Sequence, residues 1–336
     1  MACRPLYWIA IAVAAPTMLG AGLWAAMALW VRLIPASLTS DILACAMILL
    51  TLTAMICLGL RRWRVVGLWG VVFAVILGWW AMLTPSNDRA WAPDTARTPY
   101  GVVESDRLIL HNVRHFAWRS DTDFDENWET RTYDLGQITG ADLFMSYWTG
   151  EAIAHTILSF GFTDGQHLAF SIEIRKEKAE SYSALAGFFR TYELAMIAAD
   201  ERDVVGVRTN VRGEDVRLYR LRMPPDRARA LLQEYVGQAN ALHRAPQFYN
   251  SLTTNCTTQI FRMVRALQPG IPLDYRMLLA GLVPDYIYDR GGLDTRLPFE
   301  TLREKSHIKG RAASSDSDFS SKIREGVPSP RVEPLR

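Results

Sequence analysis

The first 83 residues consist of long apolar stretches with short polar breaks, whereas the rest of the chain has the shorter apolar runs of a folded soluble domain. Three stretches contain no charged residue: Leu6–Val31, Ile42–Leu60 and Val65–Leu83. Each is long enough to cross the ~30 Å hydrocarbon core of a bilayer as a helix. A cleaved signal peptide would not be followed by two more spans. The pattern predicts a three-helix transmembrane anchor over residues 1–83.

Basic residues predict the orientation of this anchor. Arg61, Arg62 and Arg64 lie between the second and third stretches, and the positive-inside rule places that turn in the cytoplasm. The N-terminus is then cytoplasmic as well, and the chain after Leu83 is periplasmic. We therefore expect a multi-pass protein of a bacterial inner membrane with its C-terminal domain in the periplasm.

The remaining chain predicts one soluble domain between a linker and a tail. Residues 84–100 are rich in Pro, Asp, Asn and Thr and predict a linker, and residues 306–336 are polar and predict a disordered tail. Between them, residues 101–305 alternate strand-like and helix-like segments. Short strands are predicted within Gly101–Trp118, at Val204–Thr209 and at Val216–Leu221, and helices within Glu180–Ala199 and at Pro225–His243.

Two strand-like runs, Ala152–Phe162 and His167–Arg175, are joined by Thr-Asp-Gly-Gln, a strong hairpin signal. A two-residue turn would place the apolar side chains of the two runs on opposite faces. A three-residue turn with Gly165 left-handed places them on one face, because a one-residue slip flips a whole strand. In that register His155 lies opposite Glu173, close enough for the carboxylate to orient the imidazole. A cross-strand polar pair facing solvent remains the alternative.

A polar, turn-prone run leads from Phe248 to Cys256, where an apolar helical stripe begins. Thr254 or Asn255 is a candidate N-cap, which places Cys256 in the first helical turn. There the helix dipole and free backbone N–H groups favour a thiolate and a developing oxyanion. The stripe consists of Ile260, Phe261, Val264 and Leu267.

The predicted membrane topology places this cysteine in a different compartment from the others. Cys3 lies on the cytoplasmic side, and Cys45 and Cys57 lie inside the second span, so Cys256 is the only cysteine of the predicted exported domain. An oxidising compartment normally pairs cysteines. Cys256 is therefore either deeply buried, an intermolecular disulfide partner, or retained because its thiol reacts.

Charge and composition limit the possible partners. The net charge of +2 is too small to favour nucleic acid, and the soluble part lacks a basic run with interleaved aromatics. His111 and His115 would lie about 13 Å apart on one strand face. No Cys, Asp or Glu set at ligand spacing accompanies them, so we expect no metal and no organic cofactor. The oligomeric state is not indicated.

Three motifs together resemble the N-terminal periplasmic domain family of bacterial lipoprotein N-acyltransferases (Lnb). They are the run Ile153–Phe162 with His155, the run Leu168–Glu177 with Glu173, and Phe248-Tyr-Asn250 leading to Thr254-Asn-Cys256-Thr-Thr. The resemblance covers roughly Trp91 to Leu302. It implies an α+β, circularly permuted papain-like (NlpC-type) domain with an antiparallel sheet and a cysteine helix, in which Cys256 is the nucleophile and His155 the base.

These observations predict a membrane-anchored periplasmic thiol acyltransferase or amidohydrolase that acts on lipoprotein or lipid acyl groups. Glu173 would orient His155, and the oxyanion or substrate would be bound by the Cys256 N–H with Asn255, Tyr249 or Asn250. One alternative is a peptidoglycan peptidase or amidase with the same catalytic set. Another is a non-catalytic envelope scaffold that uses the hairpin face for docking.

Overall fold

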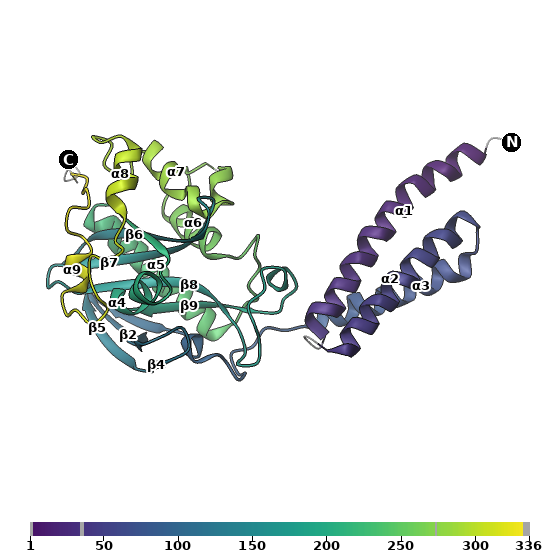
Figure 1. Ribbon diagram of the computed structural model, residues 1–336, viewed down its shortest axis with the longest axis horizontal. Coiled ribbons are helices and arrows are strands. Elements are labelled where there is room, and N and C mark those ends of the chain that lie inside the picture. The colour runs from purple at the N-terminus through teal and green to yellow at the C-terminus, as the bar shows by residue number, and fades with distance from the viewer. Residues whose placement is uncertain (1–2, 34–36, 273, 332–336) are drawn as a thin grey trace. The chain divides into compact units, whose positions relative to one another are not determined.

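The computed structural model describes residues 3–33, 37–272 and 274–331, which form two compact units (Figure 1). The first unit contains residues 1–85 together with residues 179–192. The second contains residues 86–178 and 193–336. The chain therefore leaves the second unit once, between two of its strands, and returns to it.

The first unit contains the predicted membrane helices. They are α1 (Cys3–Ala28), continued by a π-helical turn at Leu29–Leu33, α2 (Leu38–Gly59) and α3 (Trp63–Met82). All three are long and apolar enough to cross a membrane, which confirms the predicted spans. Small side chains such as Ala25, Ala44 and Ala54 are buried between the helices, where they allow close approach of the backbones.

The second unit is built on an eight-stranded sheet with the order β1-β2-β9-β8-β7-β6-β10, in which β5 also pairs with β2. All pairings are antiparallel except β2 with β9. The strands are β1 (Tyr100–Glu104), β2 (Arg107–Arg114), β5 (Trp128–Asp134), β6 (Ile138–Thr149), β7 (Ile153–Phe162), β8 (His167–Arg175), β9 (Glu193–Ala199) and β10 (Asp215–Arg220). A separate pair consists of β3 (Ala117–Trp118) and β4 (Phe124–Asp125).

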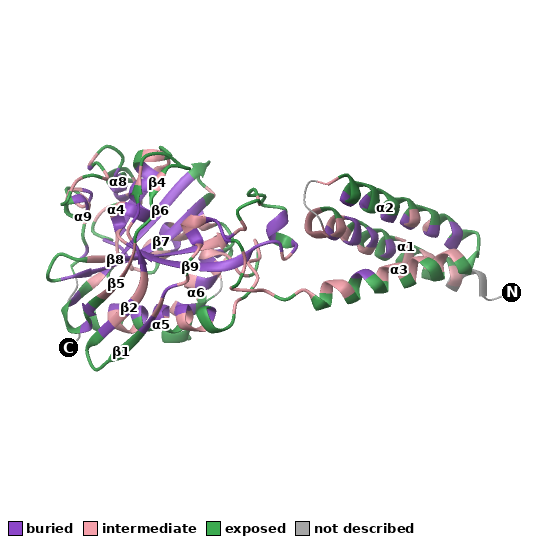
Figure 2. Ribbon diagram, turned by 90° about the horizontal axis from the view of Figure 1, so that it is seen from below, coloured by how far each residue is buried: buried purple, intermediate pink, exposed green. Residues whose placement is uncertain are grey.

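Both faces of this sheet are covered, and Figure 2 shows the buried residues concentrated on its strands. The larger core lies under α5 (Pro225–Arg244), α6 (Cys256–Leu267), α7 (Val283–Asp289) and α8 (Phe299–Ser306). The smaller core lies under α4 (Glu201–Val204) and α9 (Phe319–Lys322). A mixed α+β fold with a mainly antiparallel sheet is thus confirmed.

The predicted hairpin register is confirmed. The Phe162 amide donates to the Gln166 carbonyl (3.0 Å), and Gly161 pairs with His167. Gly165 has φ +84°, the left-handed conformation that a three-residue turn with a bulge requires. Leu158 and Phe160 consequently face the larger core, and Ile157 faces the smaller one.

Two local predictions were wrong. Residues 193–199, expected to continue a helix, form strand β9, and every residue of that strand is buried. A run that is apolar on both faces has no period that separates a buried strand from a buried helix. Val204–Thr209, expected as a strand, contains the last residue of α4 and the first part of a π-helical turn at Val207–Val211. Val204 and Val205 pack inside the smaller core.

The predicted domain limits also require correction. The linker 84–100 belongs to the folded unit from Ser86 on, where the Ala92 amide bonds to the Lys176 carbonyl (2.9 Å) and Trp91 is buried. Residues 306–331 are not a disordered tail, because Ile308, Phe319 and Ile323 fill the smaller core. Residues 332–336 lie outside the described residues.

Candidate thiol site

Cys256 is the first residue of α6, as the sequence predicted. Asn255 is the N-cap, and its side-chain oxygen accepts from the Thr258 amide (2.9 Å) while the Thr258 hydroxyl accepts from the Asn255 amide (2.9 Å). This capping box fixes the helix start. The thiol is half-buried, and Cys256 is unpaired. As the first helical residue, Cys256 has a backbone N–H that the helix itself does not use.

His155 lies on β7 with its imidazole buried, at 8 % exposure. Its Nε2 lies 2.6 Å from the Ser171 hydroxyl oxygen and 3.2 Å from Glu173 Oε1, and the Ser171 hydroxyl donates to the same carboxylate oxygen (2.6 Å). Because that hydroxyl proton is given to Glu173, Ser171 accepts the proton of Nε2. Nε2 is thus occupied by Ser171 and Glu173.

The sheet opens where these groups meet. The pairing of β7 with β8 ends at Ile157 and Ser171, so it does not reach His155 and Glu173, which lie two residues further along the ladder. Helix α6 contacts both strands. Cys256 lies near enough to His155 and to the Thr156 backbone for both to lower the pKa of its thiol. The fold therefore brings together the three residues predicted from the sequence as a catalytic set.

A buried guanidinium backs the carboxylate. Arg208, from the π-helical turn, donates to Glu173 Oε1 (2.8 Å) and lies 3.5 Å from Glu214 Oε2. Glu214 in turn accepts from the hydroxyl of Ser146, the cross-strand neighbour of His155. Glu173 is therefore held from two sides and has little freedom to leave the imidazole.

The electrostatic balance favours a charged pair. Burial raises the pKa of Cys256, but the hydrogen bond to His155 and the imidazolium charge outweigh it and lower the pKa to about 7. Burial and the Arg208 charge lower the pKa of His155, yet Glu173 and the thiolate raise it to about 9. The pKa of Glu173 is held well below its usual range against burial by His155 and Arg208. The lowered pKa of Cys256 and the raised pKa of His155 both favour a thiolate beside an imidazolium.

The structure gives two predicted oxyanion groups another role. Besides capping α6 through its side-chain oxygen, Asn255 donates one amide N–H to the Ser251 carbonyl (2.9 Å). Asn250 accepts from the amides of Leu252 and Thr253 (both 3.0 Å) and builds the turn before the cysteine. Tyr249 packs against the larger core.

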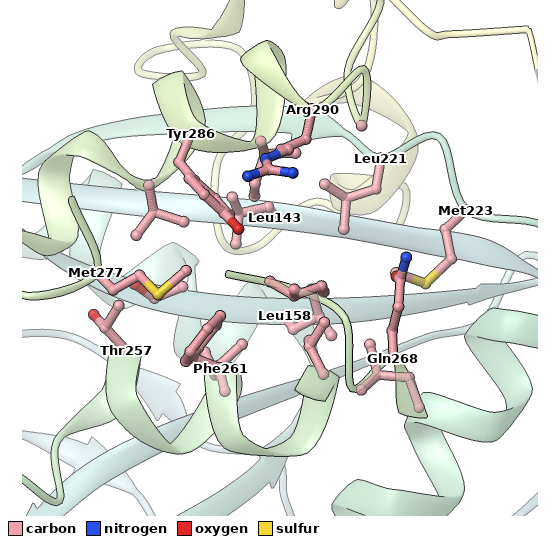
Figure 3. A pocket seen from close by; sticks show the side chains of 18 of the residues that line it. Leu143, Leu158, Leu221, Met223, Thr257, Phe261, Gln268, Met277, Tyr286 and Arg290 are labelled. Atoms are coloured by element: carbon pink, nitrogen blue, oxygen red, sulfur yellow. The ribbon is translucent and has the colours of Figure 1, made fainter. Parts of the chain in front are cut away.

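A cavity of about 490 Å³ lies between α6, α7 and the sheet (Figure 3). Thr156 and Thr257, the neighbours of His155 and Cys256 in sequence, form part of its wall. Most of the remaining wall is apolar, and Leu158, Phe261 and Met277 point into the space. The Thr156 hydroxyl is buried and has no hydrogen-bond partner within the described part of the chain.

The charged residues in the described wall of this cavity, Arg222 and Arg290, are both basic. In Figure 3 the Arg290 side chain is turned toward the cavity from the end of α7. The space thus combines an apolar volume with positive charge, which suits an amphiphile that has an acyl chain and an anionic group.

Sequence reasoning missed Ser171, Arg208 and Thr156 as parts of the site. The sequence shows that Ser171 lies two residues before Glu173 on the same strand face. It does not show that the Ser171 hydroxyl lies between His155 and Glu173. Arg208 lies in a segment predicted as a strand and 35 residues from Glu173. Only the folded chain brings it under the carboxylate.

The fold and the site define a class: an α+β domain with a cysteine at a helix start against a histidine strand, attached to three membrane helices. Residues 124–281, which include His155, Glu173 and Cys256, match the family described as the Lnb N-terminal periplasmic domain. The resemblance predicted from the sequence is thereby confirmed over these residues. The match and the three apolar helices indicate a membrane protein with a periplasmic domain. No curated protein and no solved structure matched the chain.

Proposed function

We propose that the protein is a membrane-anchored thiol acyltransferase or hydrolase that acts on acyl groups of membrane lipids or lipoproteins. The observation that carries the proposal is the Cys256–His155 pair, backed by Ser171 and Glu173, together with an apolar cavity that has basic residues in its wall. The anchor would keep such an enzyme on the bilayer that supplies its substrate.

In the proposed reaction the Cys256 thiolate attacks the acyl carbonyl and forms a thioester, while His155 gives its proton to the departing alcohol. An acceptor amine or water then loses a proton to His155 and attacks the thioester, which releases an amide or a fatty acid. The oxyanion would be bound by the Cys256 N–H and by the Thr156 hydroxyl.

The decisive experiment compares wild type with Cys256→Ser in the native membrane. Mass spectrometry of lipoprotein N-termini and of lipids should show an acyl product that disappears in the variant. Intact-mass analysis of the purified protein with lipid should show an acyl adduct on Cys256, which Cys57→Ser retains and Cys256→Ser lacks.

The other outcomes distinguish the alternatives. Altered muropeptides with unchanged acylation would favour a peptidase or amidase acting on peptidoglycan, a substrate for which the apolar cavity provides no evident use. Full complementation of a deletion strain by Cys256→Ser would favour a non-catalytic scaffold.

A further inference from the structure

The segment between β8 and β9 is a built structure rather than a loose loop. The Tyr192 hydroxyl, nearly inaccessible to solvent, donates to the Ser181 carbonyl (2.6 Å) and accepts from the Ser183 amide (2.8 Å). A short helical turn at Ala186–Phe188 follows, and its first amide bonds to the Ser183 hydroxyl (3.3 Å). We call residues 179–192 the β8–β9 segment.

This segment belongs to the same compact unit as the membrane helices. Phe189 packs edge-to-face on Trp80 with ring centroids 6.2 Å apart. The Arg190 guanidinium donates to the Trp80 carbonyl (3.0 Å) and lies 5.1 Å from the centre of its ring. Trp80 also contacts Trp24 and Trp79 edge-to-face. The segment is therefore fixed to the C-terminal end of α3.

That end of α3 is where the apolar span stops, and tryptophan is the residue type that marks membrane–water interfaces. The β8–β9 segment exposes three large side chains: Tyr182 at 63 %, Phe188 at 46 % and Leu185 at 38 %. A tyrosine with phenylalanine and leucine beside it suits the boundary between headgroups and acyl chains.

We infer that the β8–β9 segment is an interfacial membrane element whose Tyr182, Leu185 and Phe188 side chains insert into the leaflet at the C-terminal end of α3. The occupant of this apolar surface is lipid, because the partner that holds the segment is itself the end of a membrane span. The segment follows β8, the strand of Ser171 and Glu173, in the chain.

The test uses the full chain in lipid nanodiscs, with Cys3, Cys45, Cys57 and Cys256 replaced by serine. Single cysteines at positions 185 and 188 carry an environment-sensitive fluorophore. The matched controls are positions 102 and 103 in the second unit, where Val102 and Val103 are 52 % and 36 % exposed. Lipids with a quencher near the top of the acyl chain should quench positions 185 and 188 several-fold more than positions 102 and 103. Equal quenching at all four, with equal access to aqueous iodide, would overturn the inference.

A label-free measurement guards against perturbation by the fluorophore. The variant Tyr182→Ser/Leu185→Ser/Phe188→Ser should be cut by trypsin at Lys178 or Arg190 at least several-fold faster in nanodiscs, whereas Val102→Ser/Val103→Ser should not. Unchanged cleavage in the first variant would contradict membrane insertion. Because neither readout needs Cys256, failure here leaves the proposed chemistry untouched, and failure of the chemistry leaves this inference standing.

Discussion

Cys256 and His155 determine each other's charge, so replacing His155 should change the pH at which the Cys256 thiol ionises. Alkylation of Cys256 should follow its thiolate fraction, with a midpoint at about pH 7. His155→Asn removes the hydrogen bond and the imidazolium charge, which returns the midpoint to the ordinary value near 9 or above. At pH 7 the alkylation rate should therefore fall by roughly 50-fold.

The measurement is the rate of iodoacetamide labelling against pH, followed by peptide mass spectrometry at Cys256. Cys256→Ser provides the blank for the thiols of the membrane helices. An unchanged midpoint in His155→Asn would mean that the imidazole does not support the thiolate.

Thr156 gives the second prediction at this scale. Its hydroxyl is buried in the cavity wall without a partner in the described chain, which costs free energy unless a substrate group uses it. Thr156→Val keeps the branched shape and should lower kcat on the order of 10²-fold with little change in KM. Thr156→Ser should restore most of the rate. A Val variant with wild-type kcat would remove Thr156 from the oxyanion site.

At the residue level, the sequence was sufficient to predict that Cys256, His155 and Glu173 lie together, whereas it did not predict the side chains around them. A cysteine at a helix start and a histidine opposite a carboxylate follow from local patterns. Asn255 was predicted as an oxyanion donor for the same local reason, and the structure adds that its side chain caps α6 and donates one N–H to Ser251. Thr156 was missed because an unpaired hydroxyl is visible only in the folded core.

The hairpin of β7 and β8 carries both His155 and Glu173, and we use it to predict how the rate of the proposed reaction depends on pH. Activity needs the Cys256 thiolate, gained above about pH 7, and the His155 imidazolium, lost above about pH 9, so kcat/KM should be bell-shaped. Glu173 raises the pKa of His155, and Glu173→Gln should move the alkaline limb to lower pH. Ser171→Ala should move it in the same direction by less.

Both limbs of the pH profile are measured as kcat/KM against pH, with purified enzyme and a medium-chain acyl ester in mixed micelles. The matched control is Gln166→Ala in the hairpin turn, which is exposed and remote from the imidazole. If Glu173→Gln lowered the rate equally at every pH and left both limbs in place, Glu173 would have only a structural role.

Among the elements, the hairpin could be predicted to the residue, whereas β9 and α4 could not. The hairpin alternates between two faces, so only one register puts Leu158 and Phe170 in the same core. β9 is buried on both faces and has no such alternation. At the end of α4 the β-branched Val204 and the C-cap Val205 favour a strand locally, and their burial in the smaller core outweighs that preference.

For the molecule as a whole, the C-terminal segment should contribute to stability. Phe319 is 1 % exposed in the smaller core, and Arg324 pairs with Asp142 and Glu201 (2.8 and 2.5 Å). Phe319→Ala should lower the free energy of unfolding of the soluble unit by about 3–5 kcal/mol. The exposed neighbour change Ser317→Ala should stay within about 0.5 kcal/mol. Denaturant unfolding followed by near-ultraviolet circular dichroism measures both.

If the two variants were equally stable, the C-terminal segment would not contribute to the folded core, as its composition predicted. Composition averages over residues 306–336 and finds few apolar side chains. It cannot register that Ile308, Ala312, Phe319 and Ile323 are spaced to enter one core.

The last prediction concerns orientation, on which the chemistry of an unpaired thiol depends. Arg61, Arg62 and Arg64 follow α2 and begin α3, and an excess of arginine holds a turn on the cytoplasmic side. Alkaline phosphatase, which is active only outside the cytoplasm, should be active when fused after residue 331 and inactive after Arg62. Changing the three arginines to serine should reduce the contrast between the two fusions. Phosphatase activity after Arg62 in the otherwise native chain would place Cys256 in the reducing cytoplasm, and the thiol would then need no special reason to remain unpaired.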